Sequence, residues 1–263
     1  MPIRGVLFDV DDTLFDYTGS ERAGILAHLR HLGLLHRFPD PRAAALWREV
    51  TDEQYARFLA GELTFTGQQR ERARRFLARL GESGGAVTGG AVAEGGMAEG
   101  VTTEGGMTVS AMTDEAADTW FAGYTAHRDA AQAAFPDAAP VLAALAATHR
   151  LGIVSNSSTA QQRRKLHATG LLHHFPDTAI VCSDEHGEAK PAPGIFLAAC
   201  ARLGLPPEHV AHVGDDYALD ALGARRAGLH PFWLDRAAAH PAPPDPGIRV
   251  LHTLTALPAA LRA

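Results

Sequence analysis

The stretch Ile3-Arg4-Gly5-Val6-Leu7-Phe8-Asp9-Val10-Asp11-Asp12-Thr13 runs from apolar residues directly into three aspartates. Its apolar part predicts a buried strand, and in open α/β sheets ligands bind at the carboxyl ends of the strands. A helix cap or an Asx-turn accounts easily for one aspartate and poorly for three. Carboxylates this close repel one another unless a cation or a shared proton lies between them, and Mg²⁺ prefers carboxylate oxygens. The stretch therefore predicts an α/β protein with a cation-binding site at the end of its first strand.

Five more apolar runs predict four further buried strands and an edge strand, at residues 151–154, 179–182, 210–213, 232–234 and 248–251. Helical patterns adjoin them at residues 138–148, 160–169, 194–203 and 219–227. Alternation of this kind predicts a Rossmann-like parallel sheet with helices on both faces.

The alternation is interrupted between residues 16 and 134, where the sequence indicates no strand. Helical segments are predicted there at residues 20–35, 42–60, 68–80 and 115–134. The simplest interpretation is an all-helical domain inserted after the first strand, between core segments 1–15 and 135–263. A Gly-rich tract at about residues 81–112 has few large apolar side chains. It cannot offset the entropy of ordering, so we expect a flexible loop inside the insertion.

The composition is that of an ordinary globular protein, with 46% hydrophobic and 21% charged residues among 263. A net charge of −6 argues against a nucleic-acid polymer as partner, although it leaves room for a small anionic substrate. No signal peptide or membrane span is visible, so cytoplasmic residence is the default expectation. Cys182 and Cys200 are expected to be reduced and buried. His28, His31 and His36 lack metal-ligand companions and are expected on the surface.

A second acidic turn follows the predicted strand at residues 210–213, in the run Gly214-Asp215-Asp216-Tyr217-Ala218-Leu219-Asp220. Two acidic turns at two strand ends can face each other across one metal ion. The alternative is that Asp215 or Asp216 caps the following helix. Asp220 is expected on that helix, supporting the loop or a metal-bound water.

Two weaker signals lie between these acidic turns. Ser155 and Asn156 end a predicted strand just before a helix, where a hydroxyl and backbone amides suit a phosphate, although both residues are also common caps. Lys190 precedes Pro191, which restricts the local backbone. A lone lysine in a loop is usually a solvated charge, so its significance comes from its order relative to the other motifs.

In this order the four motifs resemble those of the haloacid dehalogenase superfamily. Residues 9–13 are similar to its first motif, Ser155 to its second, Lys190 to its third and Gly214-Asp215 to its fourth. The resemblance spans residues 1–16 and about 135–257. An insertion directly after the first motif resembles the helical C1 caps of that family. Asp12 stands where the family often has glycine, and we assign it no direct chemistry.

The resemblance implies a phosphatase mechanism on these residues. Asp9 would attack phosphorus and form an aspartyl-phosphate, and Asp11 would act as general acid and then as general base. The remaining implied roles are phosphate binding by Ser155, Asn156 and Lys190, Mg²⁺ binding by Asp9, Asp215 and the backbone carbonyl of Asp11, and support of these groups by Thr13, Asp216 and Asp220.

The reaction expected is Mg²⁺-dependent hydrolysis of a small phosphorylated metabolite. Asp11 disfavours 2-haloacid dehalogenation, because an alkoxide leaving group needs an acid and a halide does not. A nucleoside 5′-monophosphatase, a sugar-phosphate mutase and a non-catalytic phosphometabolite-binding module stay open as alternatives. Side chains of the insertion either line the substrate entrance or, as we favour for most, pack its helices: Tyr17, Trp47, Tyr55, Trp120, Tyr124 and Arg128.

Overall fold

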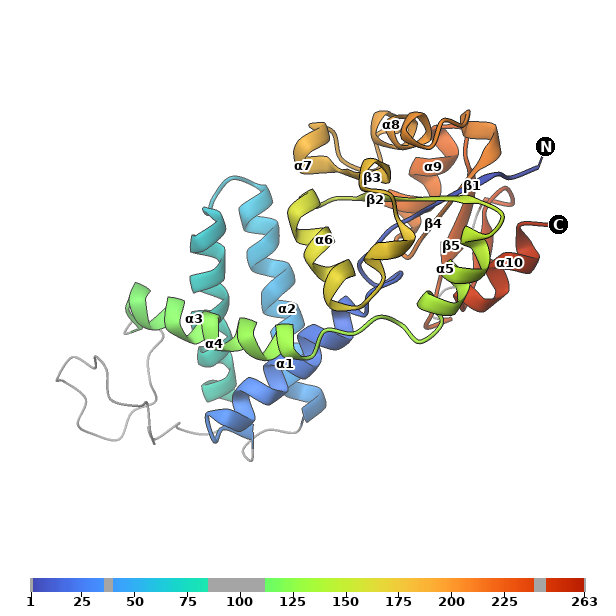
Figure 1. Cartoon of the computed structure of the whole chain (residues 1–263). Coiled ribbons are helices and arrows are strands. Elements are labelled where there is room, and N and C mark those ends of the chain that lie inside the picture. The colour runs from blue at the N-terminus through green and yellow to red at the C-terminus, as the bar shows by residue number, and fades with distance from the viewer. Residues whose placement is uncertain (1, 36–39, 85–111, 239–244, 263) are drawn as a thin grey trace, which may run out of the picture. The chain divides into compact units, whose positions relative to one another are not determined.

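The computed structural model describes residues 2–35, 40–84, 112–238 and 245–262, apart from the side chains of 59 and 82–84 (Figure 1). The chain divides into two compact units. The first, called the sheet unit, comprises Met1–Thr18 and Gln132–Ala263, and the second, called the helical unit, comprises Gly19–Ala131.

A six-stranded parallel sheet forms the centre of the sheet unit, in the order β3-β2-β1-β4-β5-β6. The strands are β1(Gly5–Phe8), β2(Arg150–Ser155), β3(Ile180–Cys182), β4(Val210–Gly214), β5(His230–Leu234) and β6(Arg249–Leu251). Every predicted strand is present, and the run at residues 248–251 lies at the edge, as predicted. β1 occupies an interior position, so its end and that of β4 adjoin in the sheet.

Helices cover both faces of the sheet, which confirms the predicted fold class (Figure 1). They are α5(Ala138–Ala146), α6(Thr159–Ala168), α7(Ser183–His186), α8(Pro193–Leu203), α9(Gly223–Arg226) and α10(Leu257–Ala260). A π-helix at Tyr217–Leu222 precedes α9, and 3₁₀ turns lie at Leu172–His174, Asp177–Ala179, Pro207–His209 and Leu254–Ala256. The helix predicted at residues 219–227 is therefore two consecutive elements of different pitch.

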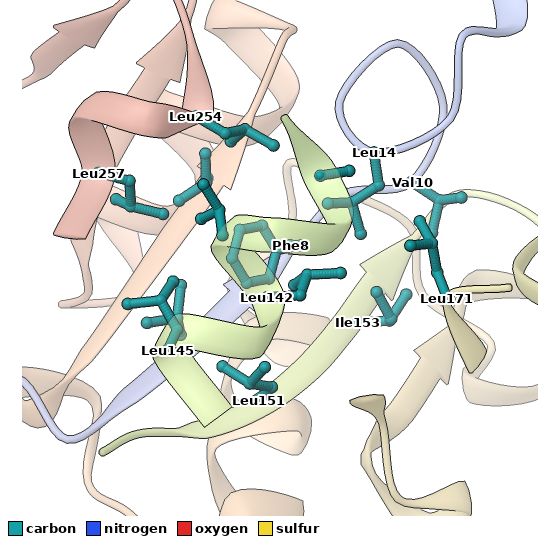
Figure 2. Packing of buried hydrophobic residues seen from close by; sticks show 14 of the residues in the cluster. Phe8, Val10, Leu14, Leu142, Leu145, Leu151, Ile153, Leu171, Leu254 and Leu257 are labelled. Atoms are coloured by element: carbon teal, nitrogen blue, oxygen red, sulfur yellow. The ribbon is translucent and has the colours of Figure 1, made fainter. Parts of the chain in front are cut away.

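Alternate residues of β1 point into two separate cores. Phe8 packs with Leu142 of α5, Ile153 and Leu257 of α10 on one face (Figure 2). Leu7 belongs to the other core, which includes residues of α8 and α9. A strand buried on both faces needs apolar residues at successive positions, and this is why the run before Asp9 shows no polar alternation. Cys182 and Cys200 are free and buried, as predicted.

The chain leaves and re-enters the sheet unit as a short antiparallel pair. Phe15 bridges Ala134, the backbone N–H of Asp16 donates to the carbonyl of Ala133 at 2.9 Å, and that of Phe135 donates to Leu14 at 3.0 Å. The two ends of the inserted segment are thus fixed side by side.

The helical unit comprises α2(Asp40–Leu59), α3(Phe65–Gly84), α4(Asp114–Ala130) and most of α1(Tyr17–His31). Its core is aromatic: the ring of Trp47 lies 5.1 Å from that of Phe76 and 4.5 Å from that of Tyr124. The helices α1 and α4 approach closely at Gly24, where an added Cβ would lie 2.5 Å from the Cα of Arg128.

Two sequence predictions about the helical unit concern its Gly-rich tract and its histidines. The Gly-rich loop is predicted from about residue 81, and α3 ends at Gly84, because Phe76 and Leu80 one turn apart hold its last turns in the core. Residues 85–111 of that predicted loop lie outside the described part of the chain. The surface position predicted for His28 is wrong: its side chain is 3% exposed, since it lies on the buried face of α1 beside Ile25 and Leu29. His31 is exposed, as predicted, and His36 lies outside the described residues.

Within the described residues, we find no helix that combines the length and the apolar character needed to cross a membrane.

Candidate active site

Asp9 lies at the carboxyl end of β1, where its backbone N–H donates to Val213 of β4 at 2.9 Å. The Nζ atom of Lys190 donates to Oδ1 of Asp9 at 2.6 Å and to Oδ1 of Asp220 at 2.7 Å. All three side chains are buried. A lysine and two aspartates that are far apart in the sequence thus form one buried charged group.

The surroundings shift the pKa values of Asp9, Lys190 and Asp220 in different directions. Burial raises the pKa of Asp9 to about 7, although Lys190 opposes that shift. Burial alone would lower the pKa of Lys190, but Asp220 and Asp9 together hold it above its ordinary range. Burial alone would also raise the pKa of Asp220, but Lys190 and His212 hold it well below its ordinary range. Asp220 is therefore the carboxylate that stays ionised and pairs with the Lys190 ammonium group.

Asp215 follows β4 and faces the same group. Burial, and then the charges of Asp9 and Asp220, raise the pKa of Asp215 to about 8. Its Oδ1 atom lies 3.5 Å from the hydroxyl of Thr13, and its backbone carbonyl accepts a 2.8 Å hydrogen bond from Nε1 of Trp233. The predicted supporting residue Thr13 thus contacts the fourth motif directly.

The donor set at this position fits a hard divalent cation. Carboxylate oxygens of Asp9, Asp215 and Asp220 lie within 4.8 Å of one another. Asp220 is the least suitable direct ligand, because Oδ1 accepts from Lys190 and His212 and Oδ2 accepts from the backbone N–H of Asp216 at 3.1 Å. Asp9 and Asp215 are the carboxylates best suited to Mg²⁺, which favours oxygen ligands.

Asp216 and Asp12 have structural partners. Oδ1 of Asp216 accepts from the backbone N–H groups of Ala218 and Leu219, each at 2.8 Å, so this residue caps the π-helix that carries Asp220. Asp12 has a positive φ of 55° and accepts from the backbone and hydroxyl of Thr18. Asp12 therefore lies in a turn that its own carboxylate stabilises through Thr18.

The second motif supports the third. Asn156 Oδ1 accepts from the backbone N–H of Lys190 at 2.7 Å, and Asn156 Nδ2 donates to the Lys190 carbonyl at 3.0 Å. Both polar ends of this amide therefore hold the lysine backbone, which favours a positioning role over phosphate contact for the side chain. Ser155 ends β2 and is 3% exposed.

Two residues of α6 that the sequence did not reveal complete the site. Gln162 Nε2 donates to Oδ2 of Asp11 at 3.0 Å and to the hydroxyl of Ser155 at 2.9 Å. Lys165 Nζ lies 2.5 Å from Oδ1 of Asp11. His212, inside β4, was also not anticipated, and its Nε2 atom lies 3.0 Å from Asp220. In the sequence all three read as ordinary helix or strand residues.

The side chains considered for a substrate entrance differ in how deeply they are buried. Trp47, Trp120 and Tyr124 belong to the core of the helical unit, which agrees with the packing role favoured for them. Tyr55 is 47% exposed, and the guanidinium of Arg128 pairs with Asp129 at 2.8 Å.

Comparison with known proteins gives matches at the levels of sequence and fold. The chain is 39% identical over 102 residues to a phosphoserine phosphatase from Thermus thermophilus, an alignment that covers 38% of this chain and 40% of that enzyme. The alignment therefore spans well under half the length of that curated relative.

Two solved structures share the fold. The hydrolase YfnB from Bacillus subtilis, bound to magnesium, has a TM-score of 0.69 at 22% identity, with full coverage of both chains. A 2-haloacid dehalogenase from Pseudomonas syringae has a TM-score of 0.54 at 25% identity, covering 99% of this chain and 98% of that one.

The model of one family, haloacid dehalogenase-like hydrolase, matches residues 3–228. That range includes all four motifs, from Asp9 to Asp215. The chain belongs to the haloacid dehalogenase-like hydrolase family.

Proposed function

We propose that the protein is a Mg²⁺-dependent phosphatase that hydrolyses a small phosphorylated metabolite through an aspartyl-phosphate on Asp9. The observation that carries this proposal is the contact of Lys190 with Asp9, at 2.6 Å, beside the carboxylate of Asp215. A buried carboxylate next to a cation and a second acidic group is suited to attack an anionic phosphoryl group, since the positive charge offsets the repulsion.

The reaction proceeds in two displacements. An oxygen of Asp9 attacks phosphorus as the ester bond breaks, and Asp11 gives its proton to the departing alcohol oxygen. A water molecule then attacks the phosphorus of the aspartyl-phosphate while Asp11 takes a proton from that water. Inorganic phosphate leaves and Asp9 is regenerated as a carboxylate.

Lys190 and the hydroxyl of Ser155 bind the phosphoryl oxygens in this proposal. Asp9, Asp215 and the backbone carbonyl of Asp11 would hold Mg²⁺, which when bound supplies positive charge against the phosphoryl group. Asn156 fixes the backbone of Lys190, and Asp220 with Thr13 supports the groups that bind.

We assign the helical unit the role of a cap that selects the leaving group. We favour phosphoryl transfer over dehalogenation because of Asp11, whose side chain is 32% exposed and can be reached by a leaving oxygen or a water. A carboxylic acid at this position can protonate an alkoxide leaving group, whereas a halide leaves without protonation.

The test is phosphate release from p-nitrophenyl phosphate and from a panel of sugar phosphates, nucleoside 5′-monophosphates and phosphoserine, with Mg²⁺ or with EDTA. We expect Mg²⁺-dependent turnover, and a loss of at least about a thousandfold in kcat for Asp9→Asn, because the nucleophile is absent. Asp177→Asn, at an exposed position, is the matched control. Turnover of 2-chloropropionate in place of every phosphate ester would contradict the proposal.

A further inference from the structure

Asp11 is held from two sides by one helix. Lys165 and Gln162 lie three residues apart on α6, and side chains at this spacing share one face of a helix. Lys165 Nζ lies 2.5 Å from Oδ1 of Asp11, and Gln162 Nε2 lies 3.0 Å from Oδ2. Each carboxylate oxygen thus has its own donor. We call Gln162 and Lys165 together the α6 cradle.

The lysine of the cradle has little freedom to move. Its side chain is 8% exposed, and Nζ lies 5.3 Å from the ring centre of Phe15 and 5.1 Å from that of Tyr17. Cations over aromatic faces are attracted by the ring electrons. Two rings and one carboxylate therefore fix the ammonium group, and through it the rotation of the Asp11 carboxylate.

The glutamine of the cradle connects the acid to the second motif. Gln162 is fully buried, and Nε2 also donates to the hydroxyl oxygen of Ser155 at 2.9 Å. The nitrogen end of Gln162 faces Asp11, and in its ionised form Asp11 can only accept a hydrogen bond from it. Since the Ser155 oxygen accepts from Gln162, its own hydrogen remains available to donate to a different oxygen.

We propose that Gln162 and Lys165 are positioning residues, which orient Asp11 for proton transfer and the Ser155 hydroxyl for a phosphoryl oxygen. This inference rests on the proposed phosphatase function and adds two residues to it. The cradle is built on a rigid element: Ser158 caps α6 by accepting from the backbone N–H of Gln161, and Leu166 is fully buried beside Lys165. Preorganised groups of this kind are what proton transfer at a fixed distance requires.

If Gln162 and Lys165 position Asp11, the loss of activity on replacing them should depend on the leaving group. If they only stabilise the fold, the loss should be the same for every leaving group. Expulsion of an alkoxide needs a proton from Asp11, whereas p-nitrophenolate leaves readily without one. The ratio kcat/KM reports the steps up to the first irreversible one, here formation of the aspartyl-phosphate, and so excludes the later use of Asp11 as a base. Comparing kcat/KM for an alkyl and an aryl ester therefore isolates the acid step.

The experiment measures kcat/KM for glycerol 3-phosphate and p-nitrophenyl phosphate in Lys165→Met, Gln162→Leu and Lys165→Arg. We expect Lys165→Met to lose about ten- to a hundredfold in kcat/KM with the alkyl ester and less than about threefold with the aryl ester, given what acid catalysis contributes. Gln162→Leu should show the same excess loss with the alkyl ester, on top of a loss common to both esters that comes from the release of Ser155. Lys165→Arg should recover part of the loss. Gln162→Leu alone should also raise the inhibition constant of inorganic phosphate, because only this variant releases Ser155.

Arg164→Met is the matched control, since it removes a cation from the exposed side of the same helix. Equal losses with both esters, or no loss with either, would overturn the inference. Crystal structures of the two variants give a readout that does not depend on turnover. The Asp11 carboxylate should leave its present orientation while Lys190 stays on Asp9. If Asp11 keeps its orientation in the variants, the positioning role of Gln162 and Lys165 is refuted. If Asp11 moves in the variants but the wild-type protein hydrolyses no phosphate ester, only the proposed reaction is refuted.

Discussion

Asp220 is 1% exposed, and its Oδ1 atom accepts from both Lys190 and His212. A carboxylate this deeply buried is costly unless it is paired and hydrogen-bonded. Burial lowers the pKa of His212, so the imidazole is neutral and donates through Nε2. Lys190 therefore supplies the charge that compensates Asp220, and the position of that lysine depends on this partner as much as on Asp9.

We predict that Asp220→Asn lowers the free energy of unfolding by about 3 kcal/mol, because removing one member of a buried ion pair leaves the other uncompensated. Urea unfolding monitored by circular dichroism measures the change. Asp177→Asn, whose side chain is 76% exposed, should stay within about 0.5 kcal/mol of the wild type. An equal effect of both substitutions would show that the buried pair gives no net stability.

The sequence indicates which residues lie together where a motif encodes them, and it does not where only tertiary contact brings them together. Asp9, Asp215 and Lys190 were predicted from strand ends and motif order, and the structure brings them together with Asp220. Lys165 looks in the sequence like any solvated helix lysine. Only the fold places Phe15 and Asp11 against it, from positions about 150 residues earlier, and no local pattern records that contact.

At the scale of elements, the approach of α1 to α4 depends on Gly24. Alanine there would gain about 1 kcal/mol from helix propensity. It would also place Cβ 2.5 Å from the Cα of Arg128, and backbone cannot move aside as a side chain can. Overpacking of this kind costs about 1–3 kcal/mol, so the clash decides the sign.

We therefore predict that Gly24→Ala destabilises the helical unit and speeds amide hydrogen exchange in peptides of α1 and α4. Gly123→Ala is the matched contrast, because its Cβ would meet the Cε1 atom of His28 at 2.7 Å, and an imidazole ring can turn away. We expect the smaller effect from Gly123→Ala. The reverse order would mean that the ring, and not the Arg128 backbone, limits the approach of the helices.

Element types were predictable because buried strands and amphipathic helices leave periodic patterns, and all six strands carry one. The π-helix at Tyr217–Leu222 was not predictable. Its wide turn depends on Asp216, whose carbonyl accepts from the backbone N–H groups of Asp220 and Ala221 while its side chain caps the same turn. Hydrophobic periodicity does not encode a choice between i+4 and i+5 bonding.

At the scale of the whole molecule, we predict that moderate acid weakens the helical unit through His28. Burial, and then the nearby His127 and His31, lower the pKa of His28 to about 4, against an ordinary value of 6.5. As the pH falls, the unfolded chain binds a proton at His28 before the folded chain does. The contribution of neutral His28 to the free energy of unfolding is therefore fully present above pH 6.5 and is lost as the pH drops towards 4. The loss is on the order of 2 kcal/mol.

Urea unfolding of a Trp233→Phe variant at pH 7.5 and 4.5 measures this effect, since the remaining tryptophans, Trp47 and Trp120, both lie in the helical unit. Introducing His28→Leu into that background should remove most of the difference between the two pH values. A difference that persists with leucine would assign the acid sensitivity to other groups.

The antiparallel pair at Phe15 and Ala134 should allow the inserted segment to be removed without unfolding the sheet unit. Since both ends of the insertion are fixed side by side by backbone hydrogen bonds, the sheet unit does not need the intervening residues to hold its own termini in place. A short glycine-serine linker from Thr18 to Gln132 should therefore yield a shortened protein that keeps its parallel sheet, detectable by circular dichroism and cooperative unfolding. The same two junctions offer a place to exchange the inserted segment for that of a relative while the sheet unit stays unchanged.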